Sequence, residues 1–297
     1  MIYDCFLFNN ELEVLDIRLH ELEHVVDKFV LVESTVTHSG KPKELLFNKN
    51  KRLFAKFKHK IIHIIIDDTP DVTLPWIIND YQFSQIVRGL KNCKSTDTII
   101  FGDVDEVPSA KSIKAGRSKK GKLKVFSQSL RCYFLNCAEY STGPWYGSRM
   151  MDYRQFVSFG TPWIAKFSKP DVIIPDGGWH FSYMGGTKRI ADKISSMTHQ
   201  EFNLDKFNTP EKISRAILSK KDLFELGWKF KIANMTDLPQ YVQENPTRFK
   251  LLLATDITLI KGFSKLSILL LELKHQLKVK LIRNMRRRLT TEALKNE

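Results

Sequence analysis

Two carboxylates separated by one residue give this sequence its clearest chemical signal. Asp103-Val104-Asp105 follows Gly102 and the apolar run Thr98-Ile99-Ile100-Phe101, which is typical of a buried strand. Paired carboxylates at a strand end can jointly bind Mg²⁺ or Mn²⁺, hard cations that take oxygen ligands and complete their shell with water and phosphate oxygens. A lone D-x-D tripeptide is a weak signal, because Asp is common at strand ends for local hydrogen-bonding reasons. Its context therefore has to support the prediction of a metal site.

The elements before this motif predict an α/β arrangement. Short apolar runs typical of buried parallel strands alternate with segments of helical spacing. The strand-like runs are residues 3–8, 29–32, 61–66 and 98–101, and the helical segments are 12–26, 49–57 and 77–90. Asn10 is expected to cap the first helix, with Glu13 at its third position. In open α/β sheets ligands bind at the carboxyl ends of the strands, and this is where Asp103 and Asp105 are expected.

Beyond Ser109 the pattern changes to short pieces separated by turns, which predicts a mixed sheet with long loops. Residues 124–134, 156–159 and 164–167 are predicted to be strands, and residues 188–197 and 210–218 helices. From Leu266 onward, apolar positions at helical spacing alternate with Lys and Arg, which predicts a basic amphipathic helix. The fold class is thus α/β, with a mixed, mostly parallel central sheet and a C-terminal helical extension.

Composition limits the function classes. The 297 residues are 42% hydrophobic, enough for a large core, and the formal net charge is +14, which favours anionic ligands such as phosphates, nucleotides or acidic membranes. Residues 250–297 carry eleven Lys or Arg against four Asp or Glu. The four cysteines lack metal-type spacing and are expected to be structural thiols in a reducing compartment. No leader or membrane-spanning pattern is expected, so the predicted location is cytoplasmic.

Five ordered blocks of the sequence carry a family resemblance over residues 2–205. They are Tyr3-Asp4-Cys5-Phe6-Leu7-Phe8-Asn9-Asn10-Glu11-Leu12, Val32-Glu33-Ser34 with Thr37-His38-Ser39-Gly40-Lys41-Pro42-Lys43, Arg88-Gly89-Leu90, Gly102-Asp103-Val104-Asp105-Glu106-Val107-Pro108, and Gly178-Trp179-His180-Phe181-Ser182-Tyr183 followed by Ser196 and His199-Gln200-Glu201. In these blocks the chain resembles glycosyltransferase family 17, whose members include the eukaryotic enzyme that adds bisecting N-acetylglucosamine to N-glycans. One departure is Gln82-Phe83-Ser84, where the family tends to show Gln-Arg followed by Asn or Asp.

The resemblance implies a GT-A fold, inversion at the anomeric carbon, and a UDP-sugar donor, with N-acetylglucosamine as the expected sugar and a glycan as acceptor. Residues 1–205 would then be the catalytic domain, with a nucleotide-binding half (1–108) and an acceptor half (109–205), followed by a helical C-terminal region (206–297). Departure of the nucleoside diphosphate places negative charge on phosphate oxygens, and a divalent ion held by Asp103 and Asp105 would stabilise that charge.

Candidate site residues follow from these blocks and from residue chemistry. His180 and His199 are candidates for a further metal ligand, although a lone histidine is more often a satisfied, partly buried side chain. The donor-binding candidates are Glu33, Lys41, Lys43, Arg88, Asp103 and Trp179. An inverting transfer also needs a base for the acceptor hydroxyl, and the candidates are Asp176, Glu201 and Glu106. Each carboxylate also has a local reading: Asp176 in a turn, Glu201 as a helix cap, and Glu106 orienting Asp105.

Three alternatives stay open at this point. The chain could bind nucleotide sugars without catalysis, as the altered segment 82–84 allows, or its basic surface could bind nucleic acid, for which no recognition motif is visible. The basic C-terminal segment could lie on an anionic membrane, on the body of the protein or on another subunit of a homo-oligomer. The preferred interpretation is a metal-dependent transferase with a nucleotide-sugar donor, a glycan acceptor and no nucleic-acid partner.

Overall fold

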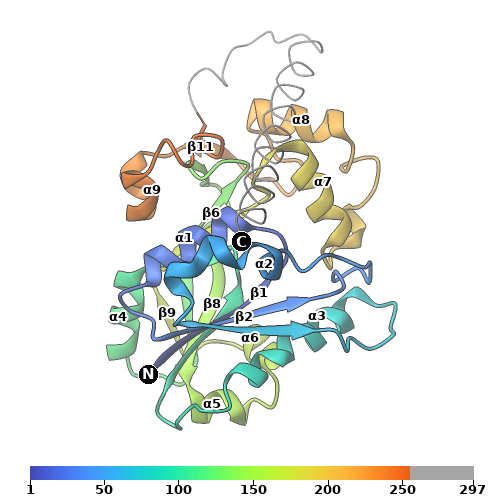
Figure 1. The fold of residues 1–297 in the computed structure, drawn as a ribbon. Coiled ribbons are helices and arrows are strands. Elements are labelled where there is room, and N and C mark those ends of the chain that lie inside the picture. Colours follow the sequence, from blue (N-terminus) through green and yellow to red (C-terminus); the bar gives the residue numbers. More distant parts are fainter. Residues whose placement is uncertain (255–297) are drawn as a thin grey trace, which may run out of the picture. The chain divides into compact units, whose positions relative to one another are not determined.

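Four parallel strands from the first 103 residues form one side of a large sheet (Figure 1). The computed structural model describes residues 1–254, which form one compact unit. β1 (Ile2–Phe8) pairs in parallel with β2 (Lys28–Ser34) and β4 (Thr98–Asp103), and β2 pairs in parallel with β3 (Ile61–Ile66). All of β1 is buried, as expected for a strand covered on both faces. The strands predicted in this half are confirmed.

Strands from the second half extend the sheet beyond β4 and make it mixed. β8 (Trp145–Asp152) runs antiparallel to β4, and β6 (Lys124–Cys132) runs antiparallel to β8. The shorter strands are β5 (Glu106–Pro108), β7 (Cys137–Glu139), β9 (Val172–Ile174), β10 (Gly178–Ser182) and β11 (Phe230–Ile232). The order is β11-β7-β6-β8-β4-β1-β2-β3, with β9 and β10 beside β6, and β5 beside β10. The predicted α/β class with a mixed sheet is confirmed.

Helices cover both faces of the parallel strands (Figure 1). One layer contains α1 (Leu12–Leu22), α2 (Leu46–Asn50), the 3-10 helix η1 (Lys51–Phe57) and α4 (Ala110–Ser118). The opposite layer contains α3 (Pro75–Ser84), the 3-10 helix η2 (Gln85–Gly89), α5 (Tyr153–Ser158) and α6 (Pro162–Phe167). Alternate residues of β1 enter the two cores: Phe6 packs with Leu15 of α1, and Cys5 packs with Phe83 of α3.

Three local predictions are wrong. Residues 156–159 and 164–167 lie in helices α5 and α6 instead of strands. Thr161 caps α6 by accepting the amide of Ile164 at 3.3 Å, and Pro162 occupies the first turn, so local helix-start chemistry decides the structure of a short apolar run. Asn10 does not cap α1: the cap position is Glu11, whose carboxylate accepts the backbone amides of Asn9 and Asn10.

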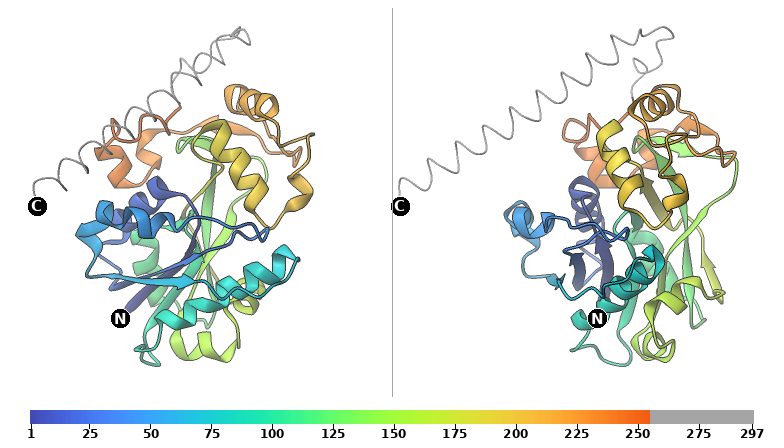
Figure 2. Two further views of the ribbon diagram at one scale, coloured as in Figure 1. Left: turned by 45° about the vertical axis from the view of Figure 1, so that its right-hand side comes forward. Right: turned by 90° about the vertical axis from the view of Figure 1, so that its right-hand side faces the viewer.

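The chain after β10 adds a group of helices at one end of the sheet. They are α7 (Gly186–Ser196), the 3-10 helix η3 (Gln200–Phe202), α8 (Pro210–Ser219), the 3-10 helix η4 (Met235–Asp237) and α9 (Gln240–Glu244). In Figures 1 and 2, α7 and α8 (gold) and α9 (orange) lie at the end of the molecule opposite α5. Ile190 and Ile194 of α7 pack with Ile213 of α8 and with Leu130 of β6.

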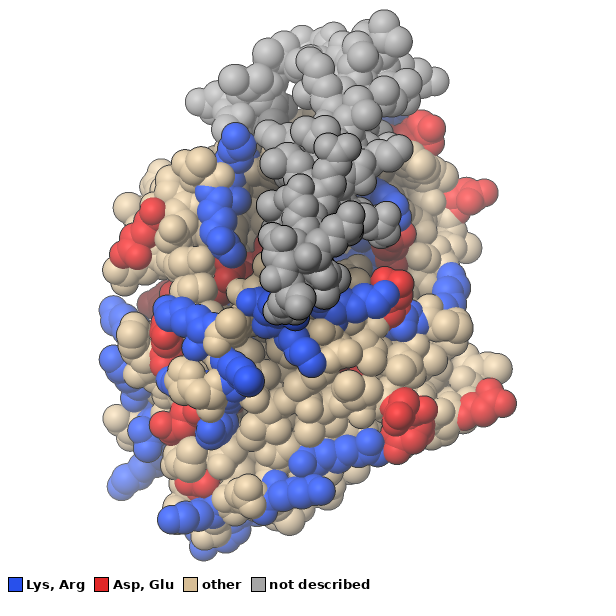
Figure 3. All heavy atoms as spheres, in the orientation of Figure 1, with Lys and Arg blue, Asp and Glu red and all other residues tan. Residues whose placement is uncertain are grey.

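Residues 206–254 belong to the same compact unit as residues 1–205, so the expected boundary at residue 205 falls inside that unit. The predicted basic helix beyond Leu266 lies outside the described residues. On the face drawn in Figure 3, Lys and Arg side chains are interspersed with Asp and Glu.

From residue 1 to residue 254, none of the helices has the length and apolar character needed to cross a bilayer.

A fully buried arginine joins α1 to β1 and to the loop after β4. Nε and Nη2 of Arg18 donate to the two carboxylate oxygens of Asp4 at 2.8 and 2.7 Å, and both side chains are 0% exposed. Nη1 donates to the backbone carbonyls of Asp103 (2.9 Å), Val104 (3.3 Å) and Glu106 (2.8 Å). The buried charge is therefore both paired and hydrogen-bonded, and these bonds of Arg18 fix the backbone of the loop that carries Asp103 and Asp105.

We expect Arg18→Met to lower the free energy of unfolding by about 3 to 5 kcal/mol, because it leaves Asp4 buried without its partner. Urea denaturation of the purified protein measures this loss. Adding Asp4→Leu to Arg18→Met should restore part of the stability, since the uncompensated carboxylate is then removed. A single variant within about 1 kcal/mol of the wild type would contradict the structural role of this pair.

Candidate active site

The paired carboxylates lie at the carboxyl end of β4, as predicted, and each forms an ion pair with a lysine from a different helix. Oδ2 of Asp103, the last residue of β4, is 2.5 Å from Nζ of Lys166 in α6. Oδ2 of Asp105 is 2.5 Å from Nζ of Lys193 in α7. The side chain of Asp103 is 37% exposed and that of Asp105 is 7% exposed. Asp103 therefore faces the open side of the site, and Asp105 faces the interior.

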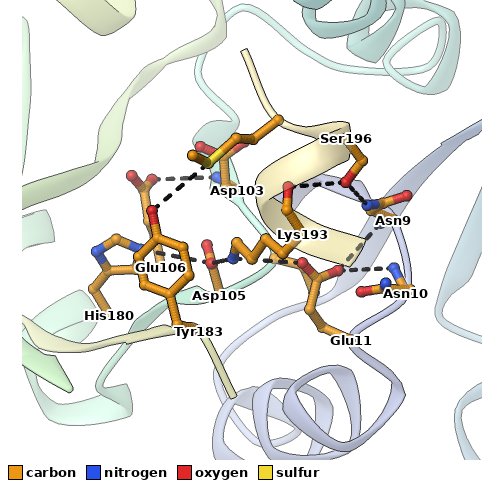
Figure 4. Close-up of polar contacts among 12 residues, drawn as sticks. Asn9, Asn10, Glu11, Asp103, Asp105, Glu106, His180, Tyr183, Lys193 and Ser196 are labelled. Carbon is orange, nitrogen blue, oxygen red and sulfur yellow. Dashed lines mark hydrogen bonds and ion pairs between the residues drawn. The ribbon is translucent and has the colours of Figure 1, made fainter. Parts of the chain in front are cut away.

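Asp105 is surrounded by further polar side chains (Figure 4). Nε2 of His180, in β10, is 3.5 Å from Oδ2 of Asp105, and Oε1 of Glu11 is 3.6 Å from Nζ of Lys193. Burial opposes ionisation of Asp105, but the charges of Lys193 and His180 hold its pKa well below the usual range. Burial likewise opposes the charge of Lys193, but the carboxylates of Asp105 and Glu11 raise its pKa. Both groups are therefore charged at neutral pH.

Glu106 fixes the loop that carries these carboxylates. Its Oε2 accepts the backbone amide of Asp103 at 3.2 Å, and its Oε1 accepts the indole N–H of Trp145 at 3.0 Å. The backbone carbonyl of Glu106 also accepts the hydroxyl of Ser148 at 2.7 Å. Because Glu106 is 2% exposed, this arrangement supports the local reading in which it positions its neighbours.

Sequence reasoning missed Lys166 and Lys193. Both come from helices distant in sequence from residues 103–105, and a lysine is usually assigned to a solvated helix face. A signal was present for Lys193, because helical spacing places it beside Ile190 and Ile194, which are buried. Lys166 follows the buried Ala165. Because residues 164–167 were assigned to a strand, the prediction did not direct the Lys166 side chain towards the site.

A cavity of about 300 Å³ lies beside the carboxyl ends of β1 and β2. Its lining includes Asn9, Asn10, Thr37, Lys41, Lys43, Ser195 and Ser196. Nζ of Lys43 donates to the carbonyl of Asn9 at 3.3 Å, and burial lowers the pKa of this lysine. The hydroxyl of Ser39 donates to the carbonyl of Ser195 at 2.9 Å, and the backbone amide of Ser39 donates to the carbonyl of Ser196 at 3.2 Å. The structure thus brings the predicted residues Lys41 and Lys43 to a cavity that α7 closes on one side.

Three other predicted donor-binding residues have local partners. Glu33 is 0% exposed and accepts the amides of Phe47 at 2.7 Å and Asn48 at 3.2 Å, so its carboxylate holds the start of α2. Nη2 of Arg88 donates to Asp68 at 2.6 Å. The indole N–H of Trp179 donates to the carbonyl of Asp237 at 2.7 Å. These contacts fix neighbouring segments, and donor contact by these residues stays a prediction.

The other two candidate bases, Asp176 and Glu201, lie in different surroundings. Asp176 is exposed and has a φ of 48°. It lies just before β10, in which Gly178 pairs with Pro108 and His180 pairs with Glu106. Its carbonyl accepts the hydroxyl of Ser109 at 3.3 Å, which supports its turn role.

Glu201 lies in η3 and accepts a 2.6 Å hydrogen bond from Nδ1 of His199, whose ring edge contacts Trp76. Burial opposes ionisation of Glu201, but this contact with His199 lowers its pKa. His199 is thus placed with Glu201 and Trp76, while His180 is the histidine beside Asp105.

Asp103, Asp105 and His180 are of the residue types that bind divalent ions, but within residues 1–254 no three such side chains are arranged to hold one. Oδ2 of Asp105 and Nε2 of His180 are 3.5 Å apart. Adjacent ligands that are each about 2.1 Å from one ion lie about 3 to 3.5 Å apart, so this pair is close to the required spacing. The ammonium of Lys193 occupies the same side of Asp105.

We expect partly buried His38 to make the protein less stable in acid. Burial, reinforced by Lys166, Lys43 and Lys193 and opposed by Asp103, lowers the pKa of this imidazole from 6.5 to about 4. The unfolded chain therefore takes up the proton first, and stability is lost as the pH falls from 6.5 towards 4. Urea denaturation at about pH 7 and about pH 5 should show a smaller loss for His38→Asn than for the wild type. Equal losses would contradict this titration.

Comparison with known proteins identifies the family of this chain. The chain is 34% identical over 116 residues to the beta-1,4-mannosyl-glycoprotein 4-beta-N-acetylglucosaminyltransferase of Rattus norvegicus, which covers 36% of this chain and 22% of that protein. The chain is 35% identical over 109 residues to the Homo sapiens protein of the same name, which covers 34% of this chain and 20% of that protein. The matched stretch thus spans about a fifth of each relative. The family model for glycosyltransferase family 17 matches residues 1–258, most of the sequence, and the chain therefore belongs to glycosyltransferase family 17.

Proposed function

We propose that this chain is an inverting GT-A-type glycosyltransferase that transfers N-acetylglucosamine from UDP-N-acetylglucosamine to a mannose-containing glycan. The observation that carries the proposal is the placement of Asp103 and Asp105 at the carboxyl end of β4, each paired with a lysine, while a cavity lies at the carboxyl ends of β1 and β2 in the same sheet. Membership of family 17 and the names of the matched relatives support the choice of donor sugar and acceptor.

The cavity beside β1 and β2 is the proposed nucleotide pocket. Its volume of about 300 Å³ is at the lower end of the range for small-molecule sites. Thr37, Ser195 and the two asparagines Asn9 and Asn10 provide hydrogen-bonding groups for a base or ribose. Lys43, on the cavity wall, is proposed to contact the diphosphate, because an ammonium group can bind phosphate oxygens.

A divalent ion, Mn²⁺ or Mg²⁺, is proposed to be held by Asp103, Asp105 and His180. When bound, the ion would neutralise the negative charge that develops on the diphosphate leaving group. Lys166 lies between Asp103 and Glu106, at 2.5 and 3.8 Å, and adds a fixed positive charge at the same edge. Burial of this site strengthens these interactions with the diphosphate.

Glu201 is the proposed general base, in preference to Asp176. Burial raises the pKa of the Tyr183 phenol, and the charges of Asp105 and Glu201 both act on this phenol in the same direction. Tyr183 also lies beneath the ammonium of Lys193, 5.7 Å from the ring centroid. Asp176 has none of these neighbours among its described contacts.

The predicted cytoplasmic location stays a prediction, as does a membrane or subunit contact of the basic C-terminal segment.

We expect UDP-N-acetylglucosamine and UDP to bind in a Mn²⁺-dependent manner, and Asp103→Ala with Asp105→Ala to abolish this dependence because the ion loses its carboxylates. Calorimetric titration with Mn²⁺ or with a chelator measures it. Lys188→Met, on the exposed face of α7, serves as the control and should bind like the wild type. Binding without hydrolysis or transfer would identify the inactive alternative, and no binding would overturn the proposed donor.

We expect Glu201→Gln to lower kcat by about a hundredfold or more, the usual contribution of a general base, with a small effect on the KM for the donor. Asp176→Asn is the matched control, since it also replaces an exposed carboxylate by an amide, and its kcat should stay close to that of the wild type. Transfer to a mannoside acceptor provides the assay. The reverse order of the two effects would assign the base to Asp176.

A further inference from the structure

The ammonium of Lys193 lies between two carboxylates that belong to different elements (Figure 4). It is 2.5 Å from Oδ2 of Asp105 and 3.6 Å from Oε1 of Glu11, and its side chain is 20% exposed. Lys193 comes from α7, Glu11 precedes α1, and Asp105 follows β4. One cation therefore has a short contact with Asp105 and a longer contact with Glu11.

Glu11 is held so that one of its oxygens stays directed at Lys193. Its Oε2 accepts the backbone amides of Asn9 at 3.3 Å and Asn10 at 2.9 Å. These bonds leave Oε1 as the oxygen that faces the ammonium. Since the Glu11 side chain is only 15% exposed, water screens this contact little. Glu11 is thus a second, preformed partner for the same lysine.

A divalent ion on Oδ2 of Asp105 would compete with Lys193 for that oxygen. An ammonium 2.5 Å from Oδ2 occupies the distance at which a metal ion would coordinate that oxygen. The two cations would also repel each other strongly at such a separation in a poorly solvated site. We therefore expect the lysine to leave Oδ2 when the ion binds there, and it then needs another partner, because an unpaired buried charge is costly.

We propose that Lys193 is a built-in competitor of the divalent ion, which neutralises Asp105 in the metal-free protein and transfers to Glu11 when the ion binds. This inference rests on the metal site of the proposed function. A lysine side chain has a flexible four-carbon stem, so its ammonium can make this short movement without displacement of the helix. Helix α7 itself is anchored by buried Ile190 and Ile194 and by the contacts of Ser39 with Ser195 and Ser196.

The exchange would keep every buried charge of the site compensated in both states. Without the ion, Lys193 balances Asp105; with the ion, Lys193 balances Glu11. The affinity for the ion would then be lower than that of a free carboxylate site, because each binding event has to break an ion pair. Lys193 and Glu11 would therefore set the metal concentration at which the site fills.

The test is a titration of Mn²⁺ into the full-length chain without donor, in which the electron paramagnetic resonance signal of free Mn²⁺ reports binding. Lys193→Met should bind Mn²⁺ about tenfold more tightly than the wild type, the scale on which one neighbouring charge alters the proton affinity of a carboxylate. Lys188→Met on the same helix is the matched control and should leave the affinity unchanged, because Lys188 pairs with Asp192 at the surface. Lys193→Arg retains the charge and should bind no more tightly than the wild type.

Glu11→Gln separates transfer of the lysine from direct coordination by Glu11. If Glu11 only receives the displaced lysine, Glu11→Gln weakens Mn²⁺ binding in the wild-type background and has little effect in the Lys193→Met background. Equal weakening in both backgrounds would overturn the exchange and make Glu11 a metal ligand. Thermal unfolding monitored by circular dichroism verifies the fold of each variant, and Lys193→Gln, which also removes the charge, replaces Lys193→Met in both comparisons where Lys193→Met is unstable.

The outcomes also separate this inference from the proposed function. Wild-type protein that binds Mn²⁺ and transfers sugar, together with a Lys193→Met variant that binds Mn²⁺ no more tightly, would overturn the competition alone. Absence of Mn²⁺ binding by the wild type, with or without UDP, would overturn both the metal site and the inference.

Discussion

The buried ion pair between Arg18 and Asp4 is the interaction on which the geometry of the site depends. Removing two charges from water costs several kcal/mol for each ion, and only good geometry with further hydrogen bonds compensates for that cost. Here the pair is bidentate, and the remaining N–H groups of Arg18 reach the backbone carbonyls of residues 103, 104 and 106. The first helix, the first strand and the acidic loop consequently form one rigid group, so Asp103 and Asp105 have a fixed direction.

Ion pairs between segments that are distant in sequence compensate the charges of the carboxylates in the site. Lys166 from α6 neutralises Asp103, and Lys193 from α7 neutralises Asp105. The two helices therefore reach the carboxylates from different parts of the fold, and electrostatic attraction helps to hold them there. The same charges suit a ligand with a diphosphate, because phosphate oxygens can take over the lysines that the carboxylates now bind.

The sequence predicted the features that depend on local pattern. Buried β-branched runs identified the four parallel strands, and the position of Asp103 and Asp105 after the fourth strand followed directly. The partners of those carboxylates were not predictable in this way, since Lys166 and Lys193 meet them only through the tertiary fold. Glu33 illustrates the same limit: its type and position suggest a ligand contact, yet its carboxylate holds the amides at the start of α2. Helices α5 and α6 were missed because their few apolar residues match either period, and Thr161 with Pro162 decided between them.

The contact of Ser39 with the end of α7 has a mechanical consequence. The hydroxyl and the amide of Ser39 bind the last carbonyls of the helix, and Ser39 belongs to the same loop as Lys41 and Lys43. The two walls of the cavity are therefore tied together at one rim. A displacement of either wall would therefore displace the other. When a ligand enters the cavity, residues 37–43 and the end of α7 should move together.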